Sequence, residues 1–192
     1  GCILKDLDEQ LGLYGRQLRL LPSTWRSASI GGFLAGGSGG IGSIRWGFLR
    51  DPGHLIGLEI VTAEREPQQI KLDASSAEGL NHAYGTNGII TALTLTTTIA
   101  IPWQEVAIDC EEWYQAVELL QTCVSSAIQL HLCSLLSREI VEHIPTWSGM
   151  PKGKHRLLIL VAPDGVSTIE RLAISAGANF AFLGQENLRG GG

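Results

Sequence analysis

The sequence predicts an α+β protein of two domains. In some segments apolar residues recur at helical spacing, whereas in others they alternate or form the β-branched runs that are typical of strands. Pro102 follows the last strand of the N-terminal half, and we place the domain boundary there, at residues 1–101 and 102–192. A chain of 192 residues is long enough to bury a core in each domain.

The first element is expected to be a helix from Asp6 to Leu20. Leu7, Leu11 and Tyr14 repeat at three- to four-residue spacing, and Asp6 or Asp8 is available as an N-cap. Pro22 closes this segment.

A hairpin and a long strand should follow the glycine-rich region. Leu55–Thr62 and Gln69–Leu72 are mostly apolar and flank a polar turn, which predicts an antiparallel pair. Ile89–Ile101 alternates apolar residues with threonines, as expected of a third strand.

The C-terminal half alternates helical and strand patterns. Asp109 with Glu112, and Ser167 with Glu170, are spaced as capping boxes, so we expect helices to begin there. The expected buried stripe of the first helix is Trp113, Val117, Leu120 and Val124. The other expected elements are strands at 127–133, 156–162 and 180–183, and a short helix at 137–143. This order predicts a ferredoxin-like α+β unit.

Composition and charge exclude several classes of protein. The net charge is −5 and basic residues form no tract, which argues against nucleic-acid binding because that needs a basic face. We find no signal peptide and no apolar run of eighteen residues, so we expect a cytoplasmic protein without a membrane span. The four cysteines show no C-x-x-C and no histidine at zinc spacing, which predicts reduced thiols and no metal site. His54 is expected at the surface.

Glycine dominates the segment from Gly31 to Gly47, where it fills eight of seventeen positions. The apolar residues between these glycines exclude a mobile linker. Glycine lets the backbone approach a ligand closely, and turns with several N–H groups pointing one way bind anions. The composition therefore leaves two interpretations open: a phosphate-binding segment or a tightly packed glycine-rich turn. No Gly-Lys-Ser/Thr follows, so this is not a Walker A loop.

The same segment resembles a known family of flavoproteins. Ser29-Ile30-Gly31-Gly32, Ala35, Gly39-Gly40, Arg45-Trp46-Gly47 and Arg50-Asp51 resemble the signature T-I-G-G-N-x-A-x-N-A-G-G…R-Y-G…R-D. Leu58–Val61 and Gly85–Thr91 resemble G-L-E-V-V and E-G-T-L-G-I-I-T, which follow in the same order. These motifs are typical of the FAD-linked oxidases of the glycolate oxidase D-subunit and D-lactate dehydrogenase group, which are vanillyl-alcohol oxidase (PCMH) type flavoproteins.

The resemblance implies a fold and a cofactor. Residues 1–101 would be the second subdomain of a PCMH-type FAD-binding fold, and residues 102–192 the start of a cap, or substrate, domain. The sequence would then be an internal part of a larger flavoenzyme. In the family, backbone N–H groups of the glycine-rich segment hold FAD. The positions of this segment that match are Ser29, Ile30, Gly31, Gly32, Phe33, Ala35, Gly39 and Gly40. Ile89 and Ile90 match later positions whose backbone meets the cofactor in the family, and Pro22, which precedes the segment, is a further expected contact. Phe33 replaces a family Asn, and Asn87 a family Leu.

The resemblance also implies an activity: oxidation of a small 2-hydroxy acid, such as glycolate or D-lactate, by hydride transfer to FAD. Electrons would pass to oxygen, a carrier or a partner subunit, and we expect a homo-oligomer. We name no catalytic residue, because the family's histidine-rich catalytic motif does not occur in this sequence. Two alternatives remain: a non-catalytic FAD-fold module or partner subunit of a flavoenzyme complex, and a protein that binds another nucleotide.

Overall fold

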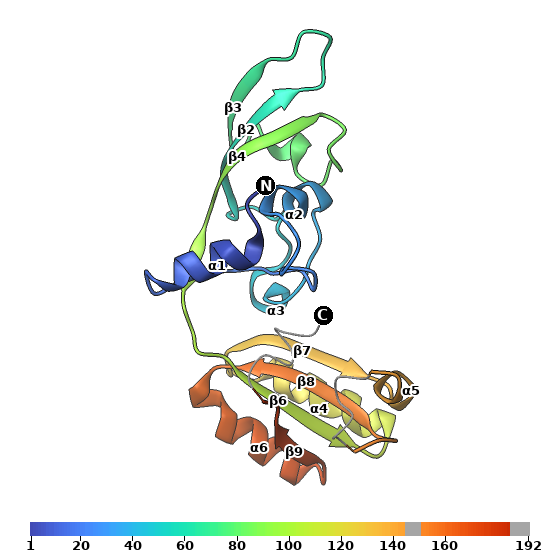
Figure 1. Cartoon of the computed structure of the whole chain (residues 1–192). Helices are drawn as coiled ribbons and strands as arrows, with labels where there is room; N and C mark the ends of the chain where they lie inside the picture. Colours follow the sequence, from blue (N-terminus) through green and yellow to red (C-terminus); the bar gives the residue numbers. More distant parts are fainter. Residues whose placement is uncertain (145–150, 185–192) are drawn as a thin grey trace. The chain divides into compact units, whose positions relative to one another are not determined.

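The computed structural model describes residues 1–144 and 151–184 (Figure 1). The chain divides into two compact units, Gly1–Ala100, called unit 1, and Ile101–Gly192, called unit 2. Each unit combines helices with antiparallel sheet, which confirms the α+β class.

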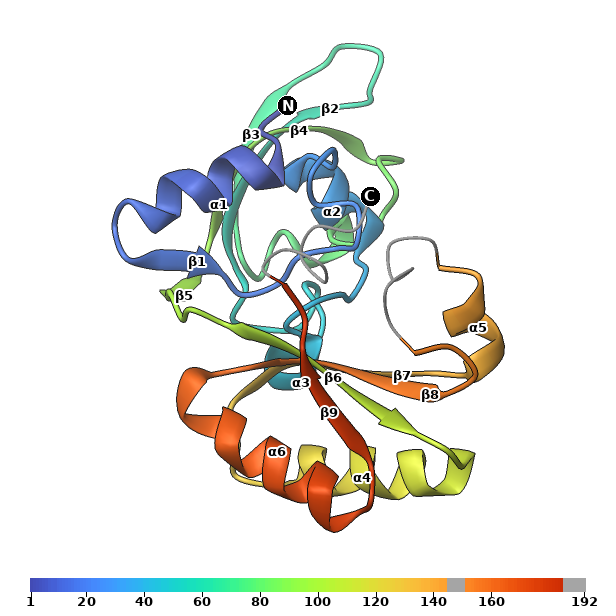
Figure 2. The ribbon, with the colours of Figure 1, turned by 60° about the horizontal axis from the view of Figure 1, so that its bottom comes forward.

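The main sheet of unit 1 has three antiparallel strands in the order β3-β2-β4. Its strands are β2 (Leu55–Thr62), β3 (Gln69–Asp73) and β4 (Gly88–Leu95). Leu58 lies opposite Leu72, and Ile60 opposite Ile70, so the predicted hairpin is confirmed. Leu58 and Ile60 are both buried, and helix α2 (Ile30–Gly36) lies beside this sheet (Figures 1 and 2).

The predicted helix from Asp6 to Leu20 is wrong in its second half. Helix α1 ends at Gly12 (Leu4–Gly12), the chain turns at Gly15 with φ +66°, and Arg16–Leu18 forms strand β1. Neither aspartate caps α1, whose N-cap is Ile3. The Oδ1 atom of Asp8 instead accepts a hydrogen bond from the Leu18 N–H (2.9 Å) and so ties the helix to the strand.

The predicted strand from Ile89 to Ile101 is divided in two. Strand β4 ends at Leu95 and β5 (Thr97–Ile99) pairs with β1 in a separate two-stranded sheet. Between them, the Thr96 N–H donates to the His54 carbonyl (2.9 Å). The break is a change of partner, which alternation of residue types does not reveal.

Unit 2 is a four-stranded antiparallel sheet in the order β7-β8-β6-β9. Its elements are β6 (Gln104–Cys110), α4 (Trp113–Ser125), β7 (Leu130–Leu136), α5 (Arg138–Glu142), β8 (His155–Val161), η3 (Pro163–Gly165), α6 (Val166–Ser175) and β9 (Asn179–Phe182). The chain order and strand order are those of a ferredoxin-like unit, as predicted. Helices α4 and α6 lie on one side of this sheet (Figure 2).

The core of unit 2 lies between these two helices and the sheet. Ile108, Ile159 and Ile169 are fully buried there. The buried residues of α4 are Ala116, Leu119 and Cys123, so the predicted stripe is offset; Trp113 and Val124 are more than 40% exposed.

Neither predicted capping box forms. Asp109 belongs to strand β6, and α4 starts after Glu112 with no side-chain cap. Helix α6 starts at Val166, after Gly165, again with no side-chain cap.

Candidate cofactor site

The glycine-rich segment folds as two short helices joined by a turn. Ser29 is the N-cap of α2, and its Oγ accepts a hydrogen bond from the Gly32 N–H (3.1 Å). Serine is a favoured N-cap because it satisfies a backbone donor that the helix leaves open. Gly37, in the left-handed conformation, ends α2, and α3 (Ser43–Trp46) follows.

Several of the predicted FAD-contacting amides are satisfied within the protein. The Ile30 N–H donates to the Cys2 carbonyl (2.9 Å), the Phe33 N–H to the Ser29 carbonyl (2.9 Å), and the Gly40 N–H to the Ser43 Oγ (2.8 Å). These groups are not free donors for a ligand. Pro22 has no N–H, and its carbonyl accepts from Trp25 (3.1 Å).

Other amides of the segment remain open. Within the described ranges 1–144 and 151–184, the N–H groups of Ser29, Gly31, Ser38 and Gly39 have no hydrogen-bond partner. Ser29 and Gly31 lie at the start of α2, and Ser38 and Gly39 just after its end. Ser38, which stands where the motif has alanine, was not among the predicted contacts.

At two positions of the segment, close packing within the protein leaves no room for a side chain larger than that of glycine. A Cβ on Gly40 would lie 2.9 Å from the carbonyl carbon of Leu21 and 3.0 Å from Cα of Pro22. These backbones approach because Leu21 and Ile41 exchange two hydrogen bonds, of 3.0 and 2.8 Å. A Cβ on Gly37 would lie 2.6 Å from Cγ of His82. At these two positions close packing accounts for the glycine without a ligand.

The second predicted contact region meets the first at Gly31. A Cβ on Gly31 would lie 3.7 Å from Cγ2 of Ile90, in ordinary contact. The structure thus brings Ile90 of β4 to the first turn of α2. Ile89, its neighbour, is 70% exposed.

The loop that precedes β4 is the strained part of unit 1. His82 and Tyr84 have φ values of +65° and +53°, and they are the non-glycine residues with positive φ in the described ranges. Such backbone costs on the order of 1–3 kcal/mol per residue and persists only where surrounding contacts impose it. No residue pattern in the sequence indicated this strain.

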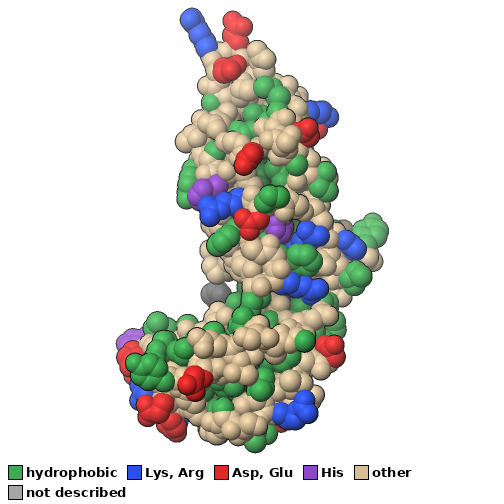
Figure 3. Space-filling model, turned by 180° about the vertical axis from the view of Figure 1, so that it is seen from behind, with side chains coloured by type: hydrophobic (Ala, Val, Ile, Leu, Met, Phe, Trp, Pro, Cys, Tyr) green, Lys and Arg blue, Asp and Glu red, His purple; other side chains and the backbone are tan. Residues whose placement is uncertain are grey.

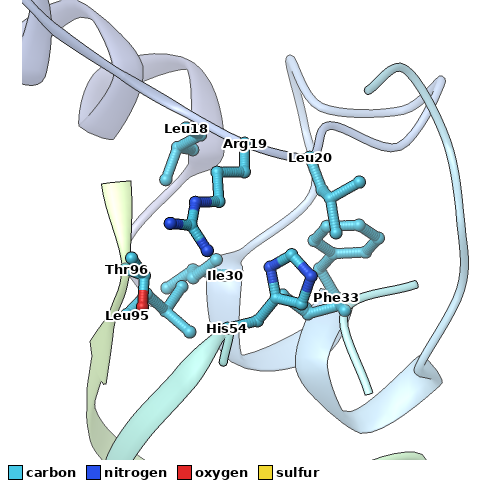
Figure 4. Close-up of a pocket in the computed structure, with 9 residues that line it drawn as sticks. Leu18, Arg19, Leu20, Ile30, Phe33, His54, Leu95 and Thr96 are labelled. Carbon is cyan, nitrogen blue, oxygen red and sulfur yellow. The ribbon is translucent and has the colours of Figure 1, made fainter. Parts of the chain in front are cut away.

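A small cavity lies beside Ile30 and Phe33 (Figure 4). Its volume is about 10 Å³, which is room for about one water molecule. The Nε atom of Arg19, at its edge, is buried and has no hydrogen-bond partner among the residues that the structure describes, while Nη1 donates to the Gly53 carbonyl (3.1 Å). Burial, with a smaller contribution from the charge of Arg16, lowers the pKa of Arg19. The cavity is too small for a flavin.

His54 also lines this cavity and is 4% exposed, so its expected surface position is wrong. Its Nε2 donates to the Trp46 carbonyl (2.9 Å). This bond and the Thr96 contact make His54 a connection between α3 and the end of β4.

The glycine-rich segment lies in a positively charged part of the sequence. Residues 10–50 contain five arginines and no aspartate or glutamate. Arg19 and Arg45 lie over the ring of Trp46, at 4.3 and 5.0 Å, and Arg50 lies over Phe48 at 5.2 Å. On the face drawn in Figure 3, basic and acidic side chains are interspersed over unit 1.

Unit 2 contributes buried polar side chains, among them Asp109, His131 and Arg156. Within the described residues, no group of three or more His, Cys, Asp or Glu side chains is placed to hold a metal ion. The same part of the chain contains no helix long and apolar enough to cross a membrane. All four cysteines are free thiols, as predicted.

Comparisons with known proteins identify the fold and the cofactor. Residues 1–69 match the family model described as FAD binding domain, which indicates FAD as the cofactor, as predicted. Two solved structures of alkyldihydroxyacetonephosphate synthase, from P1 and P212121 crystals, match with TM-scores of 0.77 and 0.74. Sequence identities are 18% and 16%, at a level that shows the fold alone. A search of curated proteins found no match.

The chain is therefore an α+β protein with the PCMH-type FAD-binding fold. The structural matches cover 97% of this chain but 42% and 39% of the synthase chains. The chain thus spans about two fifths of the length of the proteins it resembles.

The residues present fit a diphosphate group. The open amides of Ser29, Gly31, Ser38 and Gly39 are neutral donors, and the surrounding sequence lacks carboxylates that would repel an anion. The amides of Ile30, Gly32, Phe33 and Gly40 do not fit this role, because each already donates within the protein.

Proposed function

We propose that this chain is the cofactor-holding part of an FAD-dependent oxidoreductase. Unit 1 would be the second half of the FAD domain and unit 2 the beginning of a cap domain. The observation that carries the proposal is the set of open amides at both ends of α2, in the region that matches the FAD-binding model.

In this proposal the backbone of unit 1 does the binding. The N–H groups of Ser29, Gly31, Ser38 and Gly39 would donate to the diphosphate, and the backbone at Ile89 and Ile90 of β4 would lie against the cofactor. Bound FAD supplies the capacity to accept a hydride, since redox chemistry belongs to the cofactor and the protein holds and tunes it.

For the substrate we propose a small 2-hydroxy acid such as glycolate or D-lactate. The support is the ordered set of motifs from Ser29 to Thr91, which resembles the hydroxy-acid branch of the flavoproteins. A second candidate is a phosphate-bearing substrate. The name of the synthase that shares the fold, and the acid-free, arginine-containing stretch 10–50, favour that candidate.

A non-catalytic role is the alternative to both. No general acid, base or nucleophile is identified in the described residues, and Phe33 stands where the family has Asn. A panel of 2-hydroxy acids and phosphorylated ketones, assayed for flavin reduction by the larger oxidoreductase of which this chain is proposed to be a part, distinguishes the three proposals. Reduction by one class supports that substrate, and reduction by none supports the non-catalytic role.

Cofactor binding is tested by thermal unfolding with FAD, ATP and NAD at matched concentrations. A ligand at about 100 times its Kd stabilises the folded state by about 2.7 kcal/mol, so the true ligand raises Tm the most. We expect FAD to give the largest increase in Tm. A larger shift with ATP would instead support the interpretation as another nucleotide binder.

Two glycine-to-alanine substitutions, one in the proposed site and one outside it, test where FAD binds. Gly31→Ala would place a methyl group beside an open amide, in ordinary contact with Ile90, and should weaken FAD binding without unfolding unit 1. At Gly12 a Cβ meets nothing within 4 Å, so Gly12→Ala is the control. Equal FAD affinity in both variants would contradict the assigned site.

A further inference from the structure

We propose that His82 is a positioning residue that rests on Gly37 and holds the loop of residues 81–88 against the C-terminal end of α2. The loop so fixed presents Ile90 beside Gly31, whose amide is open. The part of this inference that concerns FAD rests on the proposed function, whereas the part that concerns the loop does not.

The first support is a set of three hydrogen bonds to the last turn of α2. The His82 N–H donates to the Leu34 carbonyl (3.1 Å) and the Tyr84 N–H to the Ala35 carbonyl (2.9 Å). The Nδ1 atom of His82 lies 2.5 Å from the Gly36 carbonyl oxygen and, because that oxygen only accepts, must carry the proton. The last carbonyls of a helix have no partner in the helix itself. Here a segment more than forty residues away donates to three of these carbonyls, of which that of Leu34 also accepts from the Gly37 N–H (3.1 Å).

The second support is the fit between the two residues. Gly37 has φ +58° and no side chain, and the ring of His82 occupies the place where a Cβ would lie. His82 in turn adopts φ +65°, which a residue other than glycine rarely does. The small residue and the strained one are complementary, because the ring fills the space that a side chain at position 37 would occupy.

The third support is where the loop leads. Residue 88 begins β4, and Ile90 reaches the first turn of α2 at Gly31. One segment of nine residues, 82–90, therefore contacts both ends of the same helix. Because the open amides flank this helix, a loop released at His82 also loses its alignment beside them.

Hydrogen exchange of the 192-residue chain measures the loop directly. His82→Ala removes the imidazole bond, and we expect the Tyr84 amide to exchange about tenfold faster, the change that loss of about 1.4 kcal/mol produces. His82→Asn should restore protection, because asparagine tolerates positive φ and its side-chain N–H can donate to the Gly36 carbonyl. A general loss of packing would not be rescued by asparagine.

Gly37→Ala tests the other partner of the contact. Its control is Gly15→Ala, since Gly15 has φ +66° but a Cβ there meets nothing within 4 Å. Both variants carry the same backbone penalty, and only Gly37→Ala displaces the His82 ring. We expect faster exchange at Tyr84 in Gly37→Ala alone.

FAD titration of the same variants completes the test. His82→Ala and Gly37→Ala should weaken FAD binding by about tenfold, and His82→Asn and Gly15→Ala should not. Unchanged exchange at Tyr84 in His82→Ala would overturn the inference. If the unsubstituted chain binds no FAD while exchange responds as expected, the proposed function fails and the role of His82 in holding the loop stands.

Discussion

Asp109 of β6 lies opposite Arg156 of β8, and their side chains form a bidentate ion pair. Nε of Arg156 lies 2.6 Å from Oδ1 of Asp109, and Nη2 lies 2.9 Å from Oδ2. Nη2 also donates to the Pro151 carbonyl (2.9 Å), and the two side chains are 0% and 6% exposed. A charge buried this deeply depends on its partner, because water cannot replace it.

Asp109→Ala should therefore lower the free energy of unfolding by about 3–5 kcal/mol, the cost of breaking a buried pair. The surface pair of Lys71 and Glu59 is the control, and Glu59→Ala should lower the free energy of unfolding far less, because solvent screens this pair. Urea denaturation followed by far-UV circular dichroism measures both. A similar decrease in the free energy of unfolding in the two variants would show that the buried pair stabilises the fold no more than the surface pair does.

Gly40→Ala should destabilise unit 1 by about 1–3 kcal/mol, the usual range for overpacking. The new Cβ would meet the backbones of Leu21 and Pro22, which cannot rotate away as a side chain can. Gly12→Ala, where the Cβ meets open space, should stay within about 0.5 kcal/mol of the unsubstituted protein. Thermal unfolding distinguishes them, and an unchanged Tm for Gly40→Ala would contradict this contact.

The thiols should react in two groups. Cys2 is exposed, whereas Cys110 and Cys123 are fully buried and Cys133 is partly buried. Burial raises the pKa of Cys110 and of Cys123 to about 11, and that of Cys133 to about 12, so little thiolate forms at neutral pH. We expect one thiol to react rapidly with a chromogenic disulfide reagent and three only after denaturant is added. Cys2→Ser should remove the rapid phase, and a persisting rapid phase would disprove the assignment.

The same pKa shifts predict how stability depends on pH. A thiol whose pKa is higher in the folded state than its unfolded value of 9.0 stays protonated when the unfolded chain has already ionised. Stability from this source is full below pH 9 and is lost as the pH rises toward 11, because the unfolded state then binds fewer protons. Cys123→Ala, which removes one such thiol, should flatten the decline in urea midpoint between pH 9 and 11. An equally steep decline would place its cause elsewhere.

Much of the fold could be predicted from local pattern. The hairpin of β2 and β3 and the apolar strand β8 have strong periodicity and no competing signal, and each was found within about two residues of its position. The helix predicted to reach Leu20 failed because Gly15 reverses the chain and β1 then pairs with β5, more than eighty residues later. A pairing at that distance leaves no local trace.

Asp109 shows why local signals also mislead. Three residues before Glu112 it has the spacing of a capping box, yet in the fold it continues β6 to reach Arg156. In the candidate site, the glycine-rich segment was recognised from the sequence. The sequence did not distinguish its open amides from those that donate hydrogen bonds within the protein. That difference depends on partners such as Cys2 and Ser43, whose positions only the folded chain defines.

Ser29 allows helix capping and cofactor binding to be measured separately. Its Oγ accepts from the Gly32 N–H, so Ser29→Ala should cost unit 1 about 1 kcal/mol, as loss of an N-cap usually does. Ser29→Asp keeps a good cap, so unfolding should be close to that of the unsubstituted protein. Its carboxylate would nevertheless stand beside the open amides of Ser29 and Gly31, where a bound diphosphate would be repelled.

We therefore expect Ser29→Asp to retain its Tm and to lose FAD affinity by about tenfold or more, since repulsion of about 1.4 kcal/mol suffices. Ser29→Thr, which keeps the hydroxyl and matches the residue typical of the motif, is the control and should keep both. Urea unfolding and FAD titration on the three variants provide the measurements. If Ser29→Asp bound FAD as tightly as Ser29→Thr, the anion could not lie at the start of α2, because a fixed negative charge there would have to weaken it.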